Sequence, residues 1–458
     1  MKVIICGAGQ VGWQLARHLA GERIDVTVID SNPDLVRRAI DTLDVQGVVG
    51  FASHPDVLDR AGATDADMLI AATHSDEINM VTCQVAHSIF AITKKVARLR
   101  GQSYLNAVYS DLYRQDHMPI DVVISPEREV ADAAMRRLAV PAAFDTVSFL
   151  GGRAELMGIS LDDDCPAVNT PLRQLSDLFS TLRATVVGVR RNGTLFAPEA
   201  GDQLFPGDDI YVFSHKDDSL RALEVFGKKA MPPERVVIVG AGNVGLGVAK
   251  SLEGRPGRVR TRIIEANRSR AEHVADSLDR TIVLHGDGLD TELLAEAHIE
   301  EADAMLAVTD DDKVNILAAV RAKTAGTRMA VCLINDPTLT SLMGPFGIDA
   351  YINPRTITVS SILRHVRQGP VLGVYSIGDA EAEILEARVH STTPISGKAV
   401  RDIDFPEGAL VGAIRKGDEV IRLTGDTRIE VGDAVAIFAM AKDVFAVERL
   451  LQVTVDFF

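Results

Sequence analysis

Short apolar runs alternate with amphipathic stretches along the first quarter of the chain. The runs VIIC, VTVID and MLIAAT have the length of buried strands, whereas GWQLARHLAG and DLVRRAIDTL carry apolar residues at helical spacing. Strands and helices in this order are typical of βαβ units, which build a parallel sheet covered by helices on both faces. The pattern predicts a Rossmann-like α/β domain over residues 1–125.

The same pattern returns in the second half of the chain. KVIICGAGQVG aligns with RVVIVGAGNVG, and IDVVISP aligns with IDAYINP. This repeat predicts a second Rossmann-like domain over residues 234–353. A run of helical periodicity follows each domain, over residues 126–146 and 354–370. Each run begins with a proline, which suits the first turn of a helix, so we expect a crossover helix in each half.

A β-rich segment with glycine turns follows each predicted helix. Apolar and polar residues alternate between NG, KG and GD turns over residues 147–228 and 371–458. This alternation predicts a small α+β domain with a largely antiparallel sheet in each half, and we align the two by pairing Gly188 with Gly412. The stretch GKKAMPPER between the halves has the composition of an exposed linker. The chain is thus predicted to be a tandem of two similar halves.

Length and charge narrow the possible roles. A chain of 458 residues is too long for a single core. The formal net charge of −16 argues against a nucleic acid or an anionic membrane as a partner bound through bulk electrostatics. No apolar run approaches the roughly 18 residues of a membrane-spanning helix, and the amino terminus lacks the pattern of a signal peptide. We expect a cytoplasmic protein that reaches a membrane only through a partner.

The first glycine-rich loop carries the main candidate chemistry. Gly7, Gly9 and Gly12 follow an apolar run and open a helical stretch, so they can form the tight turn, approach a diphosphate and admit close helix packing. The diphosphate would lie at the helix N-terminus, where free N–H groups and the helix dipole favour an anion. Asp30 ends the next apolar run, where its carboxylate can bind an adenosine ribose, which favours NAD(H) over its 2′-phosphorylated form. The alternative is a Rossmann-shaped domain that binds no ligand.

The second half repeats this loop as Gly240, Gly242 and Gly245, with Glu265 as the acidic residue. The neighbouring Arg268 is interpreted as a solvated helix residue rather than as a phosphate ligand.

Other polar residues are predicted at the same edge of each sheet. Thr73 and Thr309 end the runs MLIAAT and AMLAVT, at the carboxyl edge where such folds bind ligands. A cap of the following helix by Thr73 or Asp76 is an equally good interpretation. Arg98 lies in the run VARLR, while the matching run AVCLI has Cys332 in its place. Arg98 either contacts the ligand phosphates or is a plain surface charge.

Motifs of catalysis are missing from the sequence. There is no HExxH, GxSxG or GxxxxGKS/T motif, and the 11 histidines are scattered. A dehydrogenase needs an acid or base that faces the hydride, and neither β-rich segment supplies a recognisable one. The four cysteines have no CxxC or metal-ligand spacing, so we expect buried, reduced thiols and no metal site. We predict a binding protein and not an enzyme, with an NAD-dependent oxidoreductase as the rival hypothesis.

With these motifs in this order, the chain resembles the TrkA family, the cytosolic regulatory subunits of Trk-type potassium uptake systems, whose modules are called RCK or KTN domains. The resemblance rests on GAGQVG at 7–12, VIDSN at 28–32, GFASHPDVLDRAGATDADMLIAAT at 50–73, VGAGNVG at 239–245 and HGDGLD at 285–290. It covers essentially the whole chain, since GDQLFPGD and GDTRIEVGD also fit the spacing in the C-domains of the family.

The resemblance implies that NAD(H), ATP or ADP is sensed and not consumed. It also implies a homodimer or homotetrameric ring beneath an integral-membrane Trk-type potassium transporter, in the cytoplasm at the inner face of the membrane. A gating-ring regulator of another cation channel or transporter is the alternative.

The family's pockets, carried over position by position, form two sets of residues in this sequence. The first set comprises Gly7, Ala8, Gly9, Gln10, Val11, Gly12, Asp30, Thr73, His74 and Arg98. The second set comprises Gly240, Ala241, Gly242, Asn243, Val244, Gly245, Glu265, Asp287, Thr309 and Asp310. His74 departs from the asparagine-like residue expected after the first threonine. Cys332, in the place of Arg98, leaves the ligand of the second pocket open.

Overall fold

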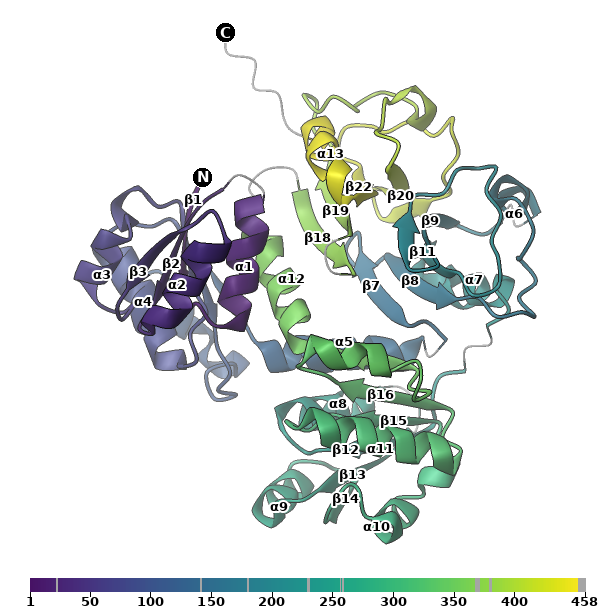
Figure 1. Cartoon of the computed structure of the whole chain (residues 1–458), viewed down its shortest axis with the longest axis horizontal. Coiled ribbons are helices and arrows are strands. Elements are labelled where there is room, and N and C mark those ends of the chain that lie inside the picture. The colour runs from purple at the N-terminus through teal and green to yellow at the C-terminus, as the bar shows by residue number, and fades with distance from the viewer. Residues whose placement is uncertain are drawn as a thin grey trace. The chain divides into compact units, whose positions relative to one another are not determined.

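The computed structural model describes residues 1–21, 24–140, 142–178, 181–228, 231–255, 257, 259–366, 371–378 and 381–451 (Figure 1). Its contacts divide the chain into two units, Met1–Val130 with Asn353–Val366 and Ala131–Ile352 with Arg367–Phe458. The predicted end of the second crossover helix at residue 370, part of the linker and the last residues of the final domain lie outside the described residues.

The first unit contains a six-stranded parallel sheet in the order β3-β2-β1-β4-β5-β6. Its strands are β1 (Lys2–Cys6), β2 (Asp25–Asp30), β3 (Gln46–Val49), β4 (Met68–Ala71), β5 (Lys94–Arg98) and β6 (Val122–Ile124). Its helices are α1 (Gln10–Gly21), α2 (Pro33–Thr42), α3 (Pro55–Arg60) and α4 (Asp76–Ser88). The strand order reverses between β1 and β4, which opens a crevice at the carboxyl edge of the sheet.

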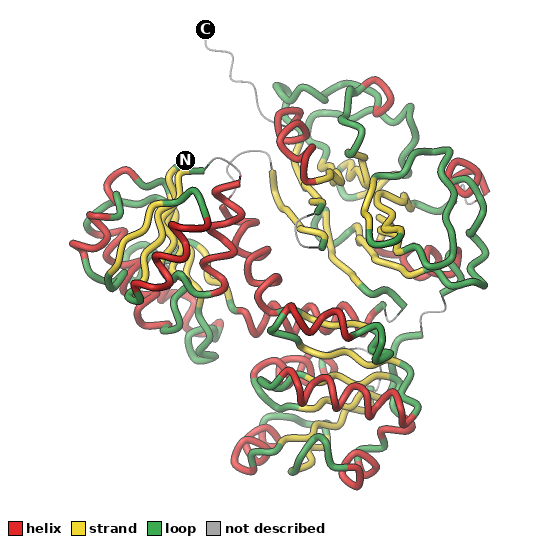
Figure 2. The backbone as a smooth tube through the Cα atoms, in the orientation of Figure 1, coloured by secondary structure: helices red, strands yellow, loops and turns green. Residues whose placement is uncertain are grey.

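Helices cover both faces of this sheet, as Figure 2 shows. Because side chains alternate along a strand, Val3 and Ile5 of β1 join the core that contains Leu15 of α1. Ile4, on the opposite face, joins the core that contains Leu58 of α3. A strand buried on both faces needs a continuous apolar run, and this explains the sequence VIIC.

The second unit contains a sheet with the same topology, in the order β14-β13-β12-β15-β16-β17. Its strands are β12 (Arg235–Val239), β13 (Arg260–Glu265), β14 (Ile282–His285), β15 (Ala304–Ala307), β16 (Met329–Leu333) and β17 (Ala350–Ile352). Its helices are α8 (Asn243–Glu253), α9 (Arg268–Asp276), α10 (Thr291–Glu296) and α11 (Asp312–Ala325). The prediction of two Rossmann-like domains is therefore confirmed.

The two crossover helices are exchanged between the halves. Helix α12 (Pro354–Val366) packs on α1 of the first domain, where Ile362 and Leu363 share a core with Leu15 and Leu19. Helix α5 (Pro126–Ala139) continues into the second unit, where Nη2 of Arg255 donates to the carbonyl oxygen of Met135 at 3.4 Å. Each helix thus contacts the Rossmann-like domain of the other half.

Helix α5 ends at Ala139, before the predicted end at residue 146. The sequence has Pro141 two residues further on, which disfavours helical backbone at Val140.

Two antiparallel sheets of five strands form the C-domains, in the orders β10-β9-β11-β8-β7 and β18-β19-β22-β20-β21. The elements of the first are β7 (Asp145–Phe149), β8 (Ala154–Ser160), α6 (Leu172–Leu178), β9 (Ala184–Arg191), β10 (Thr194–Phe196), β11 (Asp209–His215) and α7 (Ser219–Val225). Those of the second are β18 (Val371–Ile377), β19 (Ala382–Arg388), β20 (Ala409–Lys416), β21 (Glu419–Ile421), β22 (Ala434–Met440) and α13 (Val444–Leu451). Short 3₁₀ helices are η1 (Ala63–Asp65), η2 (Ala107–Tyr113), η3 (Lys216–Asp218), η4 (Ile299–Glu301), η5 (Pro337–Leu342), η6 (Val400–Asp402) and η7 (Ala441–Asp443).

The two C-domains share one core, to which Phe213 and Phe438 both belong. A Cβ atom at Gly188 would lie 3.0 Å from the ring of Phe438, and one at Gly412 would lie 2.1 Å from the ring of Phe213. The pairing of Gly188 with Gly412 is nevertheless wrong by one residue. Gly188 corresponds to Ala413, because these residues pair with equivalent positions of β11 and β22, whereas Gly412 is the extra residue of a β-bulge.

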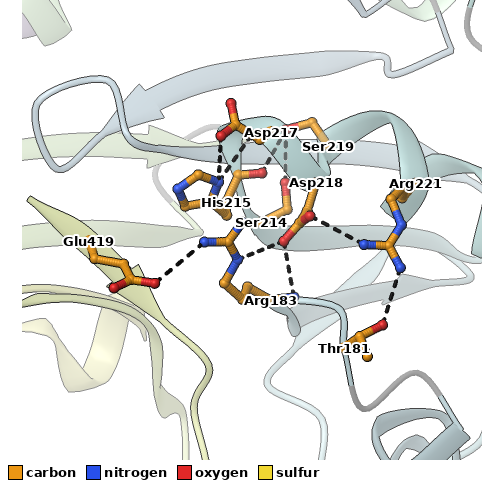
Figure 3. Close-up of polar contacts among 9 residues, drawn as sticks. All are labelled: Thr181, Arg183, Ser214, His215, Asp217, Asp218, Ser219, Arg221 and Glu419. Carbon is orange, nitrogen blue, oxygen red and sulfur yellow. Dashed lines mark hydrogen bonds and ion pairs between the residues drawn. The ribbon is translucent and has the colours of Figure 1, made fainter.

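A polar cluster around the buried Asp218 lies in the first C-domain beside the second (Figure 3). Asp218 is 6% exposed and accepts a hydrogen bond of 2.8 Å from Nε of Arg183. Nη1 of the same arginine lies 3.9 Å from a carboxylate oxygen of Glu419, which belongs to β21 of the other C-domain. Burial disfavours ionisation, but the hydrogen bond and the charge of Arg183 outweigh it and hold the pKa of Asp218 below its usual value.

Candidate nucleotide-binding site

The first glycine-rich loop has the geometry of an anion cradle. Gly7 adopts a φ of +107°, which side-chain-bearing residues rarely adopt, and its N–H donates to the carbonyl oxygen of Ile29 at 2.7 Å. A Cβ atom at Gly12 would lie 1.7 Å from the carbonyl oxygen of Gly7, so only glycine fits there. Gly9 is exposed with open space around it, and α1 begins at Gln10. The free N–H groups of the first turn of α1 therefore face the loop.

The second loop repeats this geometry. Gly240 has a φ of +102°, and a Cβ atom at Gly245 would lie 2.0 Å from the carbonyl oxygen of Gly240. Gly242 is the N-cap residue of α8, which begins at Asn243. Both halves thus place a helix N-terminus directly after a glycine turn.

The acidic residue at the end of the second strand is held against the loop in each half. Oδ2 of Asp30 accepts from the N–H of Ala8 at 2.7 Å, and Oδ1 accepts from the N–H of Asn32 at 2.8 Å. The longer Glu265 makes the same two bonds, to Ala241 and Asn267, each at 2.8 Å. A carboxylate oxygen can accept a second hydrogen bond, so both groups can also bind ribose hydroxyls.

Thr73 and Thr309 are fixed by buried asparagines that the sequence analysis missed. Oγ1 of Thr73 donates to Oδ1 of Asn79 at 2.7 Å, and Nδ2 of Asn79 donates to the carbonyl oxygen of Arg98 at 2.8 Å. Asn315 makes the equivalent bonds to Thr309 and to Leu333. Both asparagines are fully buried. A comparison of the two repeats could have identified these asparagines, because they align in SDEINM and DDKVNI.

The helix after each threonine is capped by a different residue from those expected. Oγ of Ser75 accepts from the N–H of Ile78 in α4, and Asp311 caps α11 in the same way. Asp76 instead accepts hydrogen bonds from the N–H groups of Arg100 and Gly101. Neither Thr73 nor Asp76 is the cap, so the threonine is free of that role.

Arg98 ends β5 at the carboxyl edge, and its Nε is buried without a hydrogen-bond partner among the described residues. A buried guanidinium nitrogen without a partner is costly, and a bound phosphate or carbonyl oxygen would satisfy it. Its counterpart in the second half is Leu333, not Cys332, because Ala97 and Cys332 occupy equivalent positions beside β4 and β15. The second site therefore lacks the arginine, as expected, but the residue in its place is a leucine.

The remaining predicted residues lie around the same two edges. Gln10, Val11, Asn243 and Val244 begin α1 and α8, and His74 and Asp310 are exposed in the turns before α4 and α11. Arg268 is solvated, as expected, with a side chain that is 80% exposed.

Asp287 is exposed after β14, where its Oδ1 accepts from the N–H of Leu289 at 2.9 Å. Its counterpart in the first half is Phe51, which the sequence analysis did not select. The first set thus combines Asp30 with an arginine and an exposed aromatic ring, while the second set combines Glu265 with Asp287 and Asp310. The first set is less acidic and is therefore electrostatically better matched to a diphosphate.

The four cysteines are free and buried, as expected. Burial raises the pKa of Cys83 and of Cys332 to about 12, so these thiols stay protonated and are poor nucleophiles. Within the part of the chain that the structure describes, no group of three or more His, Cys, Asp or Glu side chains could hold a metal ion. No helix in the same described part is long and apolar enough to cross a membrane.

The family models agree with this architecture. The TrkA-N domain model matches residues 3–126 and 236–354, and the TrkA-C domain model matches residues 156–227 and 384–452. The fold and the two glycine-loop sites thus define a tandem protein of the TrkA-N and TrkA-C class.

The Trk system potassium uptake protein TrkA of Azorhizobium caulinodans is 47% identical over 458 residues, and that of Halomonas elongata is 38% identical over 462 residues. Each alignment covers 100% of both chains. The chain belongs to the TrkA family of potassium uptake proteins.

Solved structures support the fold. The crystal structure of the GsuK RCK domain superposes with a TM-score of 0.58 at 16% identity, covering 98% of this chain and 94% of that chain. The GsuK channel bound to NAD gives a TM-score of 0.58 at 17% identity, covering 98% of this chain and 78% of that chain.

Proposed function

We propose that this protein is a cytoplasmic nucleotide-sensing subunit that gates a membrane potassium transporter and does not turn its ligand over. The observation that carries the proposal is the first site, where the glycine loop, Asp30 and the unpartnered Nε of Arg98 lie at one edge of one sheet. NAD(H) fits this set best, because it offers a diphosphate for the loop and a ribose for the carboxylate. The structurally similar GsuK channel, solved bound to NAD, supports this assignment.

Each residue of the first site has a defined part in binding. The first-turn N–H groups of α1 would hold the diphosphate, since the positive end of the helix dipole lies there. Asp30 would accept hydrogen bonds from the adenosine ribose hydroxyls, and Arg98 would supply a cationic side chain. The second site has leucine at this position, and we propose that it holds ATP or ADP more weakly.

The exchanged helix α12 offers a path by which nucleotide binding could change the conformation of the chain. The binding loop begins α1, α1 packs on α12, and the chain then runs from α12 toward β18 of the second C-domain. A ligand shifts a conformational equilibrium only by its differential affinity for the two states. A change in the tilt of α1 on nucleotide binding would supply that difference and would be transmitted through α12.

The partner that we propose is an integral-membrane Trk-type potassium transporter, since the relatives are named for that uptake system. We propose a homodimer or a homotetrameric ring that is peripheral at the inner face of the membrane. Nucleic acid is not a proposed partner, because the net charge of −16 would repel it. Regulation of a potassium channel is the second candidate, and the GsuK channel, with a TM-score of 0.59, favours it.

Calorimetric titration of NAD⁺, NADH, ATP and ADP tests the binding proposal. Asp30→Ala should abolish tight NAD(H) binding, whereas the matched Glu265→Ala should leave it nearly unchanged. Incubation of NADH with the protein should give no oxidation that depends on a substrate. Copurification of the chain with its membrane partner then distinguishes a transporter from a channel. Unchanged NAD(H) affinity in a Gly9→Ala, Asp30→Ala double variant would refute the proposal.

A further inference from the structure

An exposed aromatic pair lies beside Asp30 at the rim of the first sheet. Phe51 follows the end of β3 and is 54% exposed. Its ring centroid lies 5.5 Å from that of the exposed His54, with an angle of 43° between the planes. A single exposed apolar side chain is common on protein surfaces and does not by itself indicate a binding site. The position of the Phe51–His54 pair and its comparison with the second half are therefore needed to assign it a role.

The second half replaces both rings with carboxylates. The N–H of Gly50 donates to the carbonyl oxygen of Asp30, and that of Gly286 donates to the carbonyl oxygen of Glu265, each at 2.9 Å. Phe51 therefore corresponds to Asp287, and His54 corresponds to Asp290.

The exchange at the second of these positions affects the cap of a helix. Asp290 caps α10 by accepting from the N–H of Glu292, whereas His54 occupies the N-cap position of α3 without a side-chain hydrogen bond. The first half thus lacks a favourable N-cap on α3 and has instead a ring that contacts Phe51. Departures from local sequence preferences, such as the preference for an acidic N-cap, are typical of functional sites.

The strand order puts Phe51 on the side of the nucleobase. In the proposed binding mode, the diphosphate would lie at the N-terminus of α1, over β1, and the ribose would lie at Asp30, at the end of β2. A base attached to that ribose points away from the diphosphate and hence toward β3, the next strand in the sheet. An aromatic ring at that place offers a flat apolar face to a flat base.

We propose that Phe51, supported by His54, is the stacking platform for the nucleobase of the nucleotide that Asp30 holds. This inference rests on the proposed function and names the residue that binds the base. Stacking uses the π face that every base has, so the first site should accept hypoxanthine in place of adenine with little loss. At the second site, the carboxylate of Asp287 offers no face for stacking.

ADP-ribose is the probe for the test, because it carries the base, ribose and diphosphate without the redox-active ring. Phe51→Leu keeps an apolar side chain but removes the ring, and it should weaken ADP-ribose binding about tenfold, as loss of one base stack does. Phe51→Tyr should restore the affinity of the wild type. The matched control is Val49→Ala, which alters an apolar side chain that is 44% exposed on the same rim and should have no effect.

A spectroscopic readout is independent of affinity. Trp13 is the one tryptophan of the chain, so Phe51→Trp in a Trp13→Phe background carries a single fluorophore at the proposed platform. ADP-ribose should quench its emission, because a stacked base quenches an indole.

The outcomes separate the two proposals. If Phe51→Leu binds like the wild type, or the emission of Phe51→Trp does not change while Asp30→Ala abolishes binding, the platform is refuted and the nucleotide site stands. If the wild type does not bind ADP-ribose, both proposals fail.

Discussion

Arg98 is the side chain that most clearly separates the two sites. Its replacement by leucine, as found at position 333, should weaken NAD⁺ binding about 10- to 100-fold, because a charge-assisted hydrogen bond contributes roughly 1.5–3 kcal/mol. Calorimetry on Arg98→Leu measures this loss. Arg100→Leu is the matched control, since Arg100 lies two residues further on and its Nε is 3.9 Å from the carboxylate of Glu127. Equal loss in both variants would show that only overall charge matters.

Asn79 should link the stability of the first domain to its ligand affinity. Asn79→Ala leaves the N–H and carbonyl of Thr73 and the carbonyl of Arg98 without their partner, and each such buried group costs about 1–3 kcal/mol. We expect a lower melting temperature together with weaker NAD⁺ binding. Asn315→Ala should lower the melting temperature similarly but leave NAD⁺ affinity intact. Intact binding by both variants would contradict the role assigned to the threonine turn.

Single residues were predicted from sequence only where their chemistry or backbone geometry is distinctive. The glycines and Asp30 stand out because few other residues fit the turn or bind a ribose. Asn79 and Phe51 belong to no short motif, so only the fold brings them to the edge of the sheet. The register error at Cys332 arose because an apolar run such as AVCLI has no internal marker, and a shift of one residue keeps it equally apolar.

At the scale of elements, the contact of α12 with α1 should carry both stability and coupling. Leu363 is 3% exposed in this core, and Leu363→Ala should cost about 2–5 kcal/mol through lost burial and a cavity. Hydrogen exchange should show faster opening of α1 and a smaller response to NAD⁺. The control Leu317→Ala, at a position that is 52% exposed on α11, should change neither. An unchanged response of α1 in Leu363→Ala would exclude α12 as the coupling element.

The buried pair in Figure 3 predicts a pH dependence of stability. Because the pKa of Asp218 is lowered from 3.8 in the folded state, its contribution is complete above that value and is lost as the pH falls through the folded pKa. Asp218→Asn should therefore melt below the wild type at pH 5–7, with a gap on the order of 3 kcal/mol that closes as the pH falls through the folded pKa of Asp218. The neighbouring Asp217→Asn, whose side chain is 81% exposed, should melt like the wild type at every pH. A gap for Asp218→Asn that persists in acid would contradict the ion pair.

The helices and strands were largely predictable from the sequence, but the domain on which each crossover helix packs was not. Periodicity and the repeat predicted strands, helices and two antiparallel C-domains, because these depend on local alternation. The exchange of α5 and α12 depends on which apolar surface each helix meets in space. The sequences PEREVADAAMRRLA and PRTITVSSILRHV are amphipathic in the ordinary way and do not specify which sheet they cover.

For the whole molecule, the internal repeat gives two halves with one fold but different residues at the carboxyl edges of their parallel sheets. The first rim carries Arg98, Phe51 and His54, and the second carries Leu333, Asp287 and Asp290 at the corresponding positions. An unequal pair allows one site to report a dinucleotide while the other responds to a different ligand. Helix α12 packs on the first Rossmann-like domain and precedes the second C-domain in the sequence. We propose that this helix transmits occupancy of the first site along the chain.

We propose that nucleotide binding at the first site controls potassium transport. The most direct measurement is potassium uptake into proteoliposomes that contain the membrane transporter and this subunit, recorded as NADH is titrated. The uptake rate should depend on NADH with the wild-type subunit and should be insensitive to NADH with the Asp30→Ala subunit, which should still bind the transporter. The same NADH dependence with both subunits, or none with the wild type, would contradict this proposal.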